Sequence, residues 1–353
     1  MVNPLNVTIA GGSSGVENDR GNGANPARER TSAIAGLGIT DLETLDIFDQ
    51  VSRIAASALE VPLAFVSLLD GERQWIKTTR CRQMDAAPLT DSFCIHAVDG
   101  EDVFVVEDAR DDPRFATNRF VVEAPHIRFY AGAPLYAGAS IPIGALGVAD
   151  TSPRQLGPAK REVLSGLAAL ASRQLDLQRE AMMDGLTGAW NRRMLAQVVS
   201  AEIRRGNRIG RKFALAMLDL DHFKRLNDEF GHAAGDEVLI EFARLARDNL
   251  RPEDWFFRMG GEEFAALIVD SSSTKAEGLI EQLRADLEAR GPKLGGRGVT
   301  FSSGITDHRP RVLGGSDDDS LPRILARADE ALYRAKAGGR NCSVCAGQER
   351  IDA

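Results

Sequence analysis

The stretch "RMGGEEFAAL", residues 258–267, decides the fold of the C-terminal half of the chain. Two glycines and two carboxylates interrupt a run of apolar residues that would otherwise be continuous. Glycine adopts backbone conformations that are closed to other residues, so Gly260 and Gly261 predict a tight turn between two strands. Glu262 and Glu263 would then lie at the tip of a buried β-hairpin.

A second acidic site follows the run "FALAMLDLD", residues 213–221, which reads as a buried strand that ends in acids. If this strand pairs with the hairpin, Asp219 and Glu262 converge on one spot. Two carboxylates held close together repel each other unless a cation lies between them, and oxygen ligands of this kind suit Mg²⁺. The next residues, "DHFKRLND", predict the start of a helix, where backbone N–H groups and Lys224 can bind phosphate.

Strand and helix patterns alternate through the rest of this region, residues 184–346. The run "GDEVLIEFARLARDNL" predicts a helix, and further helices are expected near 274–289 and at "LPRILARADEALYRAKA". A strand is expected at "GVTFSSGI". This order around a central hairpin predicts an α+β fold, with helices layered on a mainly antiparallel sheet.

Four ordered motifs carry a resemblance to a known family. They are "DGLTGAWNRR" (184–193), "LDLDHFKRLNDEFGHAAGD" (218–236), "RMGGEEF" (258–264) and "ADEALYRAKAGGRN" (328–341). Residues 184–346 resemble the GGDEF domain of diguanylate cyclases in its GGEEF form, which implies a nucleotidyl-cyclase or palm-like α/β sandwich. The resemblance implies condensation of two GTP into cyclic di-GMP with release of two pyrophosphates.

The resemblance also implies a role for each matching residue. Two Mg²⁺ or Mn²⁺ ions per active site would be held by Asp219, the backbone carbonyl of Leu220, and Glu262. Glu262 would also serve as the base for the 3′-hydroxyl. The triphosphate would be held by side chains and backbone amides, namely Lys224, Lys336, Arg340, His222 and Phe223.

Asn227 and Asp236 match the pair that reads guanine in the family. A carboxylate accepts the two N–H donors of guanine, whereas adenine would leave it unsatisfied. Arg251 and Asp254, in "RPED", match an inhibitory site for the product cyclic di-GMP. The alternative for "RPED" is a turn with a solvated charge pair. Gln282 stands where a second arginine often joins that site.

The front of the chain carries a second resemblance. Residues 39–158 include "FVSLLDGERQWIKTTR", "DSFCIHAV", "PHIRFYAGAPLYA" and "IGALGVAD", and they resemble a GAF domain, with an antiparallel sheet and packed helices. GAF domains bind various small molecules or only dimerise, so the ligand here is unknown. Cys94 and His96 could suggest a bilin or haem site, but we favour a buried thiol and a core histidine.

Residues 159–183 predict a helical linker. Spacings of three and four residues join a heptad-like row of small and apolar positions. These positions are Leu164, Ala168, Ala171, Leu175, Gln178 and Met182. We favour a coiled-coil stalk of a homodimer, because the cyclase reaction needs two facing domains, over an amphipathic helix packed on its own domain. Residues 1–38 are expected to be disordered, and 347–353 form a tail.

Composition limits the partners. The 353 residues carry a formal charge of −8, which argues against a nucleic-acid or anionic-membrane binder. No apolar run reaches the roughly 20 residues of a membrane span, so we expect a cytoplasmic protein. Two functions remain open, an active cyclase gated by its GAF domain and a non-catalytic receptor for GTP or cyclic di-GMP. A GAF-bearing histidine kinase would need patterns that do not follow residue 183.

Overall fold

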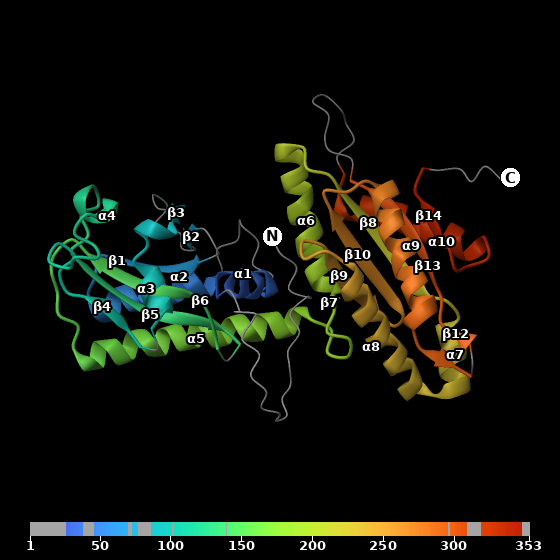
Figure 1. Cartoon of the computed structure of the whole chain (residues 1–353), viewed down its shortest axis with the longest axis horizontal. Coiled ribbons are helices and arrows are strands. Elements are labelled where there is room, and N and C mark those ends of the chain that lie inside the picture. Colours follow the sequence, from blue (N-terminus) through green and yellow to red (C-terminus); the bar gives the residue numbers. More distant parts are fainter. Residues whose placement is uncertain are drawn as a thin grey trace, which may run out of the picture. The chain divides into compact units, whose positions relative to one another are not determined.

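The computed structural model describes residues 26–37, 46–69, 73–76, 86–100, 102–138, 140–295, 297–308 and 319–347. Two compact units divide the chain between Arg179 and Glu180. Figure 1 shows a sheet covered by helices in each unit. Within the described residues, no helix combines the length and the apolar character that a membrane crossing requires.

The N-terminal unit is built on a sheet with strand order β3-β2-β1-β6-β5-β4, and all neighbouring strands are antiparallel. The strands are β1 (Leu63–Leu69), β2 (Arg73–Ile76), β3 (Ala86–Pro88), β4 (Phe104–Val106), β5 (Phe129–Ala137) and β6 (Ile141–Asp150). The helices are α1 (Pro26–Gly36), α2 (Asp46–Leu59), α3 (Cys94–Val98), α4 (Arg119–Val122) and α5 (Pro158–Met182). A 3₁₀ turn spans Leu89–Asp91. The antiparallel pairing predicted from the sequence is confirmed.

Alternation along the strands divides this unit into two apolar layers. Val66 and Leu68 of β1 pack with α1, α2 and α5, whereas Phe65 and Leu69 pack with α3 and α4. Helix α1 corrects the expectation that residues 1–38 are disordered as a whole, because Leu37 at its end is buried in the first layer. The expectation for residues 1–25 lies outside the described residues.

Helix α5 carries the heptad-like row that was predicted to face a second chain. Most of that row faces the core of its own unit instead. Leu164, Ala168, Ala171 and Leu175 are buried in the core of the N-terminal unit. They pack against their own sheet, so this part of the row cannot form a seam with a second chain. The alternative of an amphipathic helix packed on its own domain is correct for these four positions.

Cys94 and His96 lie in the second layer of this unit. Cys94 is completely buried, and the hydroxyl of Tyr130 donates to its sulfur at 3.2 Å. His96 stacks on Phe104, with ring centroids 5.6 Å apart, and meets Phe115 edge-on. Burial raises the pKa of the Cys94 thiol and lowers the pKa of His96. Cys94 is therefore a packed core group, as the sequence suggested, whereas His96 is only half-buried between aromatic rings.

The C-terminal unit is built on a sheet with strand order β14-β13-β8-β10-β9-β7. The strands are β7 (Trp190–Asn191), β8 (Phe213–Leu220), β9 (Trp255–Gly260), β10 (Glu263–Val269), β13 (Phe301–Asp307) and β14 (Ser343–Cys345). A small hairpin pairs β11 (Lys293–Leu294) with β12 (Arg297–Gly298). The central pairs are antiparallel, whereas β13 with β14 and β7 with β9 are parallel.

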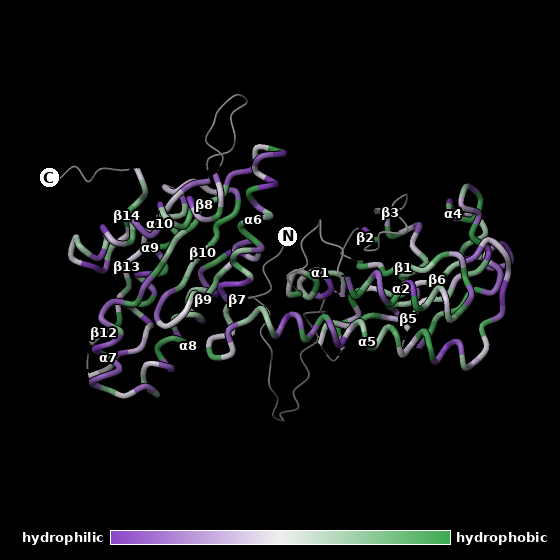
Figure 2. The backbone as a smooth tube through the Cα atoms, turned by 180° about the vertical axis from the view of Figure 1, so that it is seen from behind, coloured by the Kyte–Doolittle hydropathy of each residue, from purple (hydrophilic) through white to green (hydrophobic). Residues whose placement is uncertain are grey.

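Helices cover both faces of this sheet. They are α6 (Arg192–Ile209), α7 (Phe223–Phe230), α8 (His232–Asn249), α9 (Ser273–Arg290) and α10 (Leu321–Ala337). Apolar residues of α7, α8 and α9 pack on one face, and those of α6 and α10 pack on the other. Figure 2 shows hydrophobic residues along the central strands and hydrophilic residues around α7, which follows the edge where β8 ends.

Candidate active site

The register of β8 and β10 brings the predicted acids together. Asp219 is the direct cross-strand partner of Glu263, so both side chains leave the same face of the sheet. The turn that precedes Glu263 has Gly260 at φ 144° and Gly261 at φ 53°, values that strongly favour glycine. The backbone N–H of Leu220 donates to the carbonyl of Glu262 at 3.3 Å. The predicted convergence of β8 and the hairpin tip is confirmed.

The acids at this edge affect each other's ionisation. Burial raises the pKa of Asp219, the hydrogen bond from Lys336 lowers it, and the nearby charges of Glu262 and Asp221 raise it. The net pKa of Asp219 is raised. Burial, followed by the charge of Asp219, also raises the pKa of Glu263. Such a cluster gains stability from any cation that enters it.

The donor set fits a hard divalent cation. The side chains are all carboxylates, and Lys336 Nζ pairs with one of them, at 2.7 Å from Asp219 Oδ2. Among the described residues, no cluster of three or more His, Cys, Asp or Glu is arranged as a metal cage. Two carboxylates with a backbone carbonyl leave coordination positions for phosphate and water, as Mg²⁺ prefers.

A cavity of about 310 Å³ lies on the same face of the sheet, between the hairpin and α10. Lys336 and Glu263 line it together with Arg192 and Asp329. Its apolar lining comes from both strands and helix, namely Met217, Met259, Leu325, Leu332 and Tyr333. Burial raises the pKa of Asp329. Glu263 of the candidate site therefore borders a hollow whose lining is partly charged and partly apolar.

Arg258 holds the hairpin turn in place. Its Nε and Nη2 donate to the carbonyl of Gly261 at 3.0 and 2.9 Å, and its Nη1 lies 3.0 Å from Asp184 Oδ1. Asp184 also accepts from the backbone and the hydroxyl of Thr187, at 2.9 and 2.7 Å. One arginine thus fixes the glycine turn to the "DGLTG" loop.

Helix α7 begins at Phe223, four residues after Asp219. His222 caps it with φ 58°, and the side chain of Phe223 is buried below the helix. Lys224 is exposed in the first turn. The amides of His222 and Phe223 therefore lie at a helix N-terminus beside the acids, an arrangement that favours an anion.

The predicted guanine-reading residues lie on two adjacent helices. Asn227 is on α7 and Asp236 on α8, where Asp236 is exposed. Oδ1 of Asn227 is buried and has no hydrogen-bond partner. A Cβ atom on Gly235 would lie 1.9 Å from that oxygen, so only glycine admits the amide there. A buried acceptor without a donor is costly, and an N–H donor from a ligand would satisfy it.

Lys336 and Arg340 close the site from the C-terminal side. Lys336 lies in the last turn of α10, and Arg340 lies in the turn that follows. The side chain of Lys336 is 33% exposed, and Arg340 is exposed. Both cations can therefore meet a ligand that enters from solvent.

Arg251 and Asp254 lie away from these residues. They form the turn before β9, whereas Gly260 is at its other end, about 20 Å along the strand. Arg251 is exposed. Asp254 is fully buried, and its carboxylate accepts from the backbone N–H groups of Val269 at 3.0 Å and of Arg251 at 3.2 Å. Asp254 therefore orders the turn, and Arg251 presents the exposed charge.

Three residues of this site received no role from the sequence. Glu263 is the direct partner of Asp219, and the alternation of side chains along a strand could have identified it. Asp221 is buried and accepts from Thr300 Oγ1 at 2.8 Å and Ser302 Oγ at 2.7 Å. Arg258 could not have been assigned, because its contact with Asp184 spans 74 residues.

Comparison with known proteins identifies both units. Residues 43–175 match the GAF domain, and residues 181–342 match the domain described as "Diguanylate cyclase, GGDEF domain". The chain therefore contains a GAF domain followed by a GGDEF domain. Diguanylate cyclases of this family generally depend on Mg²⁺.

Two relatives come from Pseudomonas aeruginosa. Cyclic di-GMP phosphodiesterase PA2567 is 30% identical over 322 residues, which cover 88% of this chain and 53% of that protein. Diguanylate cyclase DgcP is 41% identical over 171 residues, covering 47% of this chain and 24% of that protein. The chain thus spans about half or less of these two relatives.

A solved structure also matches the chain. It is the GGDEF domain of DgcB from Caulobacter crescentus in complex with c-di-GMP, at 31% identity and a TM-score of 0.44. The match covers 48% of this chain and 97% of that one.

Proposed function

We propose that this chain is a diguanylate cyclase that joins two GTP molecules into cyclic di-GMP and releases two pyrophosphates. The observation that carries the proposal is the register of β8 and β10, which sets Asp219 opposite Glu263 beside the Gly260–Gly261 turn. Relatives named diguanylate cyclase support it. We also propose a cytoplasmic location, where GTP would be available as the substrate.

Each part of the site contributes a separate task. Asp219, the carbonyl of Leu220, and Glu262 would hold two Mg²⁺ or Mn²⁺ ions, with Glu263 as a further oxygen donor from the same face. When bound, these ions would neutralise charge on the phosphates and would lower the pKa of a coordinated hydroxyl. The amides of His222 and Phe223 orient the triphosphate, together with Lys224, Lys336 and Arg340.

Glu262 acts as the general base. It takes the proton of the 3′-hydroxyl that belongs to the GTP on the facing domain. That oxygen forms a bond to the α-phosphorus, and the bond to pyrophosphate breaks. Repeating the step with the roles exchanged closes the ring.

Selection of guanine follows from the α7–α8 pair. Asp236 accepts from N1–H and N2–H of guanine, and the unpaired Oδ1 of Asn227 accepts a further N–H donor. Adenine presents an acceptor at N1 and would face a carboxylate. GTP should therefore be used in preference to ATP.

The facing domain comes from a second copy of the chain. The exposed side of α5 carries Val163, Leu170 and Leu177, which are 41%, 64% and 44% exposed and seven residues apart. That spacing returns side chains to one stripe of a helix that pairs with a parallel copy. We place the homodimer seam on these three residues, because the row predicted from the sequence is largely buried in the GAF core.

Regulation would act at two places. An unidentified small molecule on the GAF domain changes activity to the extent that it binds one arrangement of the dimer better. Cyclic di-GMP inhibits by binding at the turn of Arg251 and Asp254. Arg251 makes the contact, and the buried Asp254 keeps the turn in shape. Product inhibition should be lost in Arg251→Ala.

The decisive experiment incubates the purified chain with GTP and Mg²⁺ and detects cyclic di-GMP by mass spectrometry. Glu262→Ala should reduce the rate at least about 100-fold, because an essential ligand and base is lost. Arg244→Ala, on the exposed side of α8, is the matched control and should retain full activity. A wild-type chain that binds GTP but forms no product would defeat the proposal.

The second candidate is a receptor that binds GTP or cyclic di-GMP without turnover. One relative favours this candidate, because it matches across most of this chain and yet is named a cyclic di-GMP phosphodiesterase and not a cyclase. Both candidates predict nucleotide binding, so product formation separates them.

A further inference from the structure

The turn after α10 adopts an unusual backbone. Arg340 has φ 65° and Asn341 has φ 46°, although neither is glycine, and Gly339 precedes them at φ 111°. A non-glycine residue in this region is uncommon and costs on the order of 1 kcal/mol. Such conformations persist only where the surroundings impose them. The contacts that impose this one therefore set the place of Arg340.

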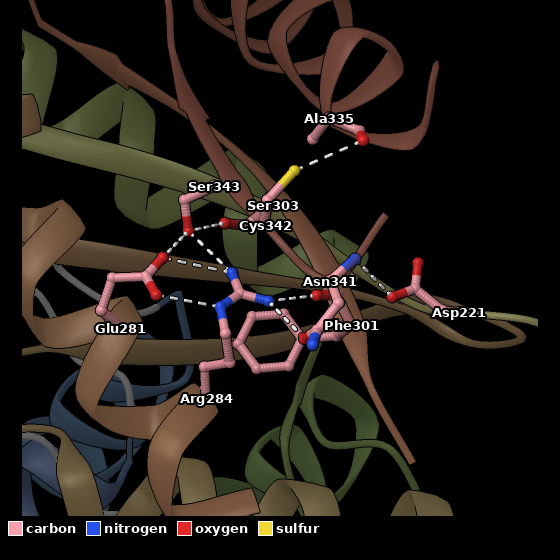
Figure 3. A network of polar contacts seen from close by, with 9 residues as sticks. All are labelled: Asp221, Glu281, Arg284, Phe301, Ser303, Ala335, Asn341, Cys342 and Ser343. Atoms are coloured by element: carbon pink, nitrogen blue, oxygen red, sulfur yellow. Dashed lines mark hydrogen bonds and ion pairs between the residues drawn. The ribbon is translucent and has the colours of Figure 1, made fainter. Parts of the chain in front are cut away.

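Asp221 and Arg284 hold Asn341 from two sides (Figure 3). The backbone N–H of Asn341 donates to Asp221 Oδ2 at 3.0 Å, and Arg284 Nη1 donates to Asn341 Oδ1 at 3.1 Å. The N–H of Arg340 itself donates to the carbonyl of Ala335 at 3.1 Å. The turn is thus tied to the end of β8, to α9 and to α10.

Arg284 is itself fixed in several directions. Its guanidinium stacks over the ring of Phe301, 4.6 Å from the centroid, and donates to the carbonyl of that residue. It also donates to Ser343 Oγ at 2.8 Å and pairs with Glu281 at 3.0 Å. Its side chain is only 12% exposed. A cation held in this way serves as a rigid support and is not free to bind a ligand.

Asp221 is likewise committed to the fold. Its two oxygens accept from the hydroxyls of Thr300 and Ser302 and from the N–H of Asn341. Asp219, two residues earlier, pairs with the ammonium group of Lys336 instead. The two acids of "DLD" therefore have separate tasks, one toward the ligand and one toward the turn that follows α10.

We propose that Arg284 and Asp221 are positioning residues for substrate, which act through Asn341 to hold Arg340 where it meets the triphosphate. The proposal rests on the proposed function, since that function assigns Arg340 to the phosphates. It adds that affinity for triphosphate depends on a buried arginine of α9 that does not touch the ligand. A side chain on a loop positions a ligand only as well as its backbone is held.

The test measures binding of α,β-methylene GTP, which cannot release pyrophosphate, to the full chain by calorimetry in the presence of Mg²⁺. Arg340→Ala should weaken binding about tenfold, since hydrogen bonds to charged groups are strong. Arg284→Ala should weaken it about three- to tenfold. Asn341→Gly removes the acceptor but tolerates positive φ, and it should weaken binding similarly.

A double variant distinguishes positioning from a general structural effect. If Arg284 acts through Arg340, then Arg284→Ala should cost no further affinity when Arg340 is already alanine. Additive losses, or an Arg284→Ala chain with wild-type affinity, would overturn the proposal. If Arg284→Ala does not fold, Asn341→Gly decides in the same way. Arg244→Ala, an arginine paired within its own helix, is the control and should bind normally.

The outcome also separates this proposal from the proposed function. A loss of affinity in Arg340→Ala without a loss in Arg284→Ala or Asn341→Gly overturns the positioning alone. A wild-type chain that does not bind the analogue overturns both.

Discussion

Lys336 Nζ lies 2.7 Å from Asp219 Oδ2, so a lysine of α10 neutralises the acid that the proposed function assigns to a metal ion. The two cations compete for one carboxylate. Lys336 is also assigned to the triphosphate, and it must leave Asp219 to reach it. Substrate and metal should therefore displace the same ion pair.

Lys336→Ala should consequently have opposite effects on two ligands. Binding of Mn²⁺ alone should become about three- to tenfold tighter, because the competing ammonium is gone. Binding of α,β-methylene GTP should become about tenfold weaker, because a phosphate contact is lost. Calorimetry on the full chain measures both. Affinities that move in the same direction would contradict the competition.

Gly235→Ala should block guanine binding without unfolding the protein. The new methyl group would lie 1.9 Å from Asn227 Oδ1 and must push that amide aside. We expect GTP affinity to fall at least about tenfold, since a hydrogen bond in the pocket is lost. Gly278→Ala is the control, because a Cβ atom there meets nothing within 4 Å. It should leave binding unchanged and stabilise α9 by up to about 1 kcal/mol.

Arg258 and Asp184 should be energetically coupled. Arg258→Ala removes both hydrogen bonds to Gly261 and the ion pair, and should cost about 1–3 kcal/mol of unfolding free energy. Asp184→Asn should cost less. A double-mutant cycle in urea should give a coupling energy of at least about 0.5 kcal/mol. Additive effects would mean that the arginine supports the turn alone.

Leu170→Glu should dissociate the proposed dimer and remove activity, because it places a charge in the apolar stripe of α5. Sedimentation velocity reports the mass, and product formation reports the activity. Ile209→Glu changes an equally exposed apolar residue on α6 and should leave both unchanged. Leu175→Pro would be uninformative, because Leu175 is 2% exposed within the GAF core. A Leu170→Glu chain that remains dimeric would refute this seam.

His308 should make the stability of the GGDEF unit depend on pH. The imidazole is buried, with Nδ1 3.2 Å from Asp319 Oδ2, Arg327 nearby and the ring stacked on Phe213. Burial lowers the pKa of His308 from 6.5, although Asp319 opposes the shift. Below about pH 6.5 the unfolded chain therefore binds a proton that the folded chain does not. The free energy of unfolding should consequently decrease as the pH is lowered.

His308→Gln should reduce that slope by up to about 1.4 kcal/mol per pH unit, the limit for one proton. Urea unfolding between pH 5 and 7 measures it, followed by fluorescence of Trp190 and Trp255, which are buried in this unit. His232→Gln, at an exposed position on α8, should keep the wild-type slope. If the unfolding free energy depended on pH equally in all three chains, the buried imidazole of His308 would not be the source of the dependence.

The sequence was most informative where pattern and chemistry agree. The Gly-Gly turn and the acid-ended strand predicted the convergence at Asp219, because period-two alternation and glycine conformation are local properties. The order of the GAF and GGDEF domains was predicted from motifs and is confirmed. The antiparallel pairing of the first sheet followed from short strands with intervening turns.

Partners distant in the chain could not be predicted. The row on α5 has the same spacing whether it faces a sheet or a second helix, and only the fold shows that Leu164 and Leu175 face the sheet. Arg284 contacts Asn341 and Ser343, which are 57 and 59 residues away in the sequence. The match of Asp254 to the inhibitory site gave no sign that its side chain is fully buried, because the burial of a turn carboxylate depends on strand packing.

The pairing of Asp219 with Glu263 has a consequence for how such a domain can lose its activity. Inserting or deleting a single residue in β8 or β10 would turn one of the carboxylates toward α8 and α9, while the motif letters stay intact. A homologue that has lost its activity in this way would still contain the complete Gly-Gly-Glu-Glu-Phe motif. Whether a homologue retains its activity is therefore better judged from the register of β8 and β10 than from the sequence of the turn.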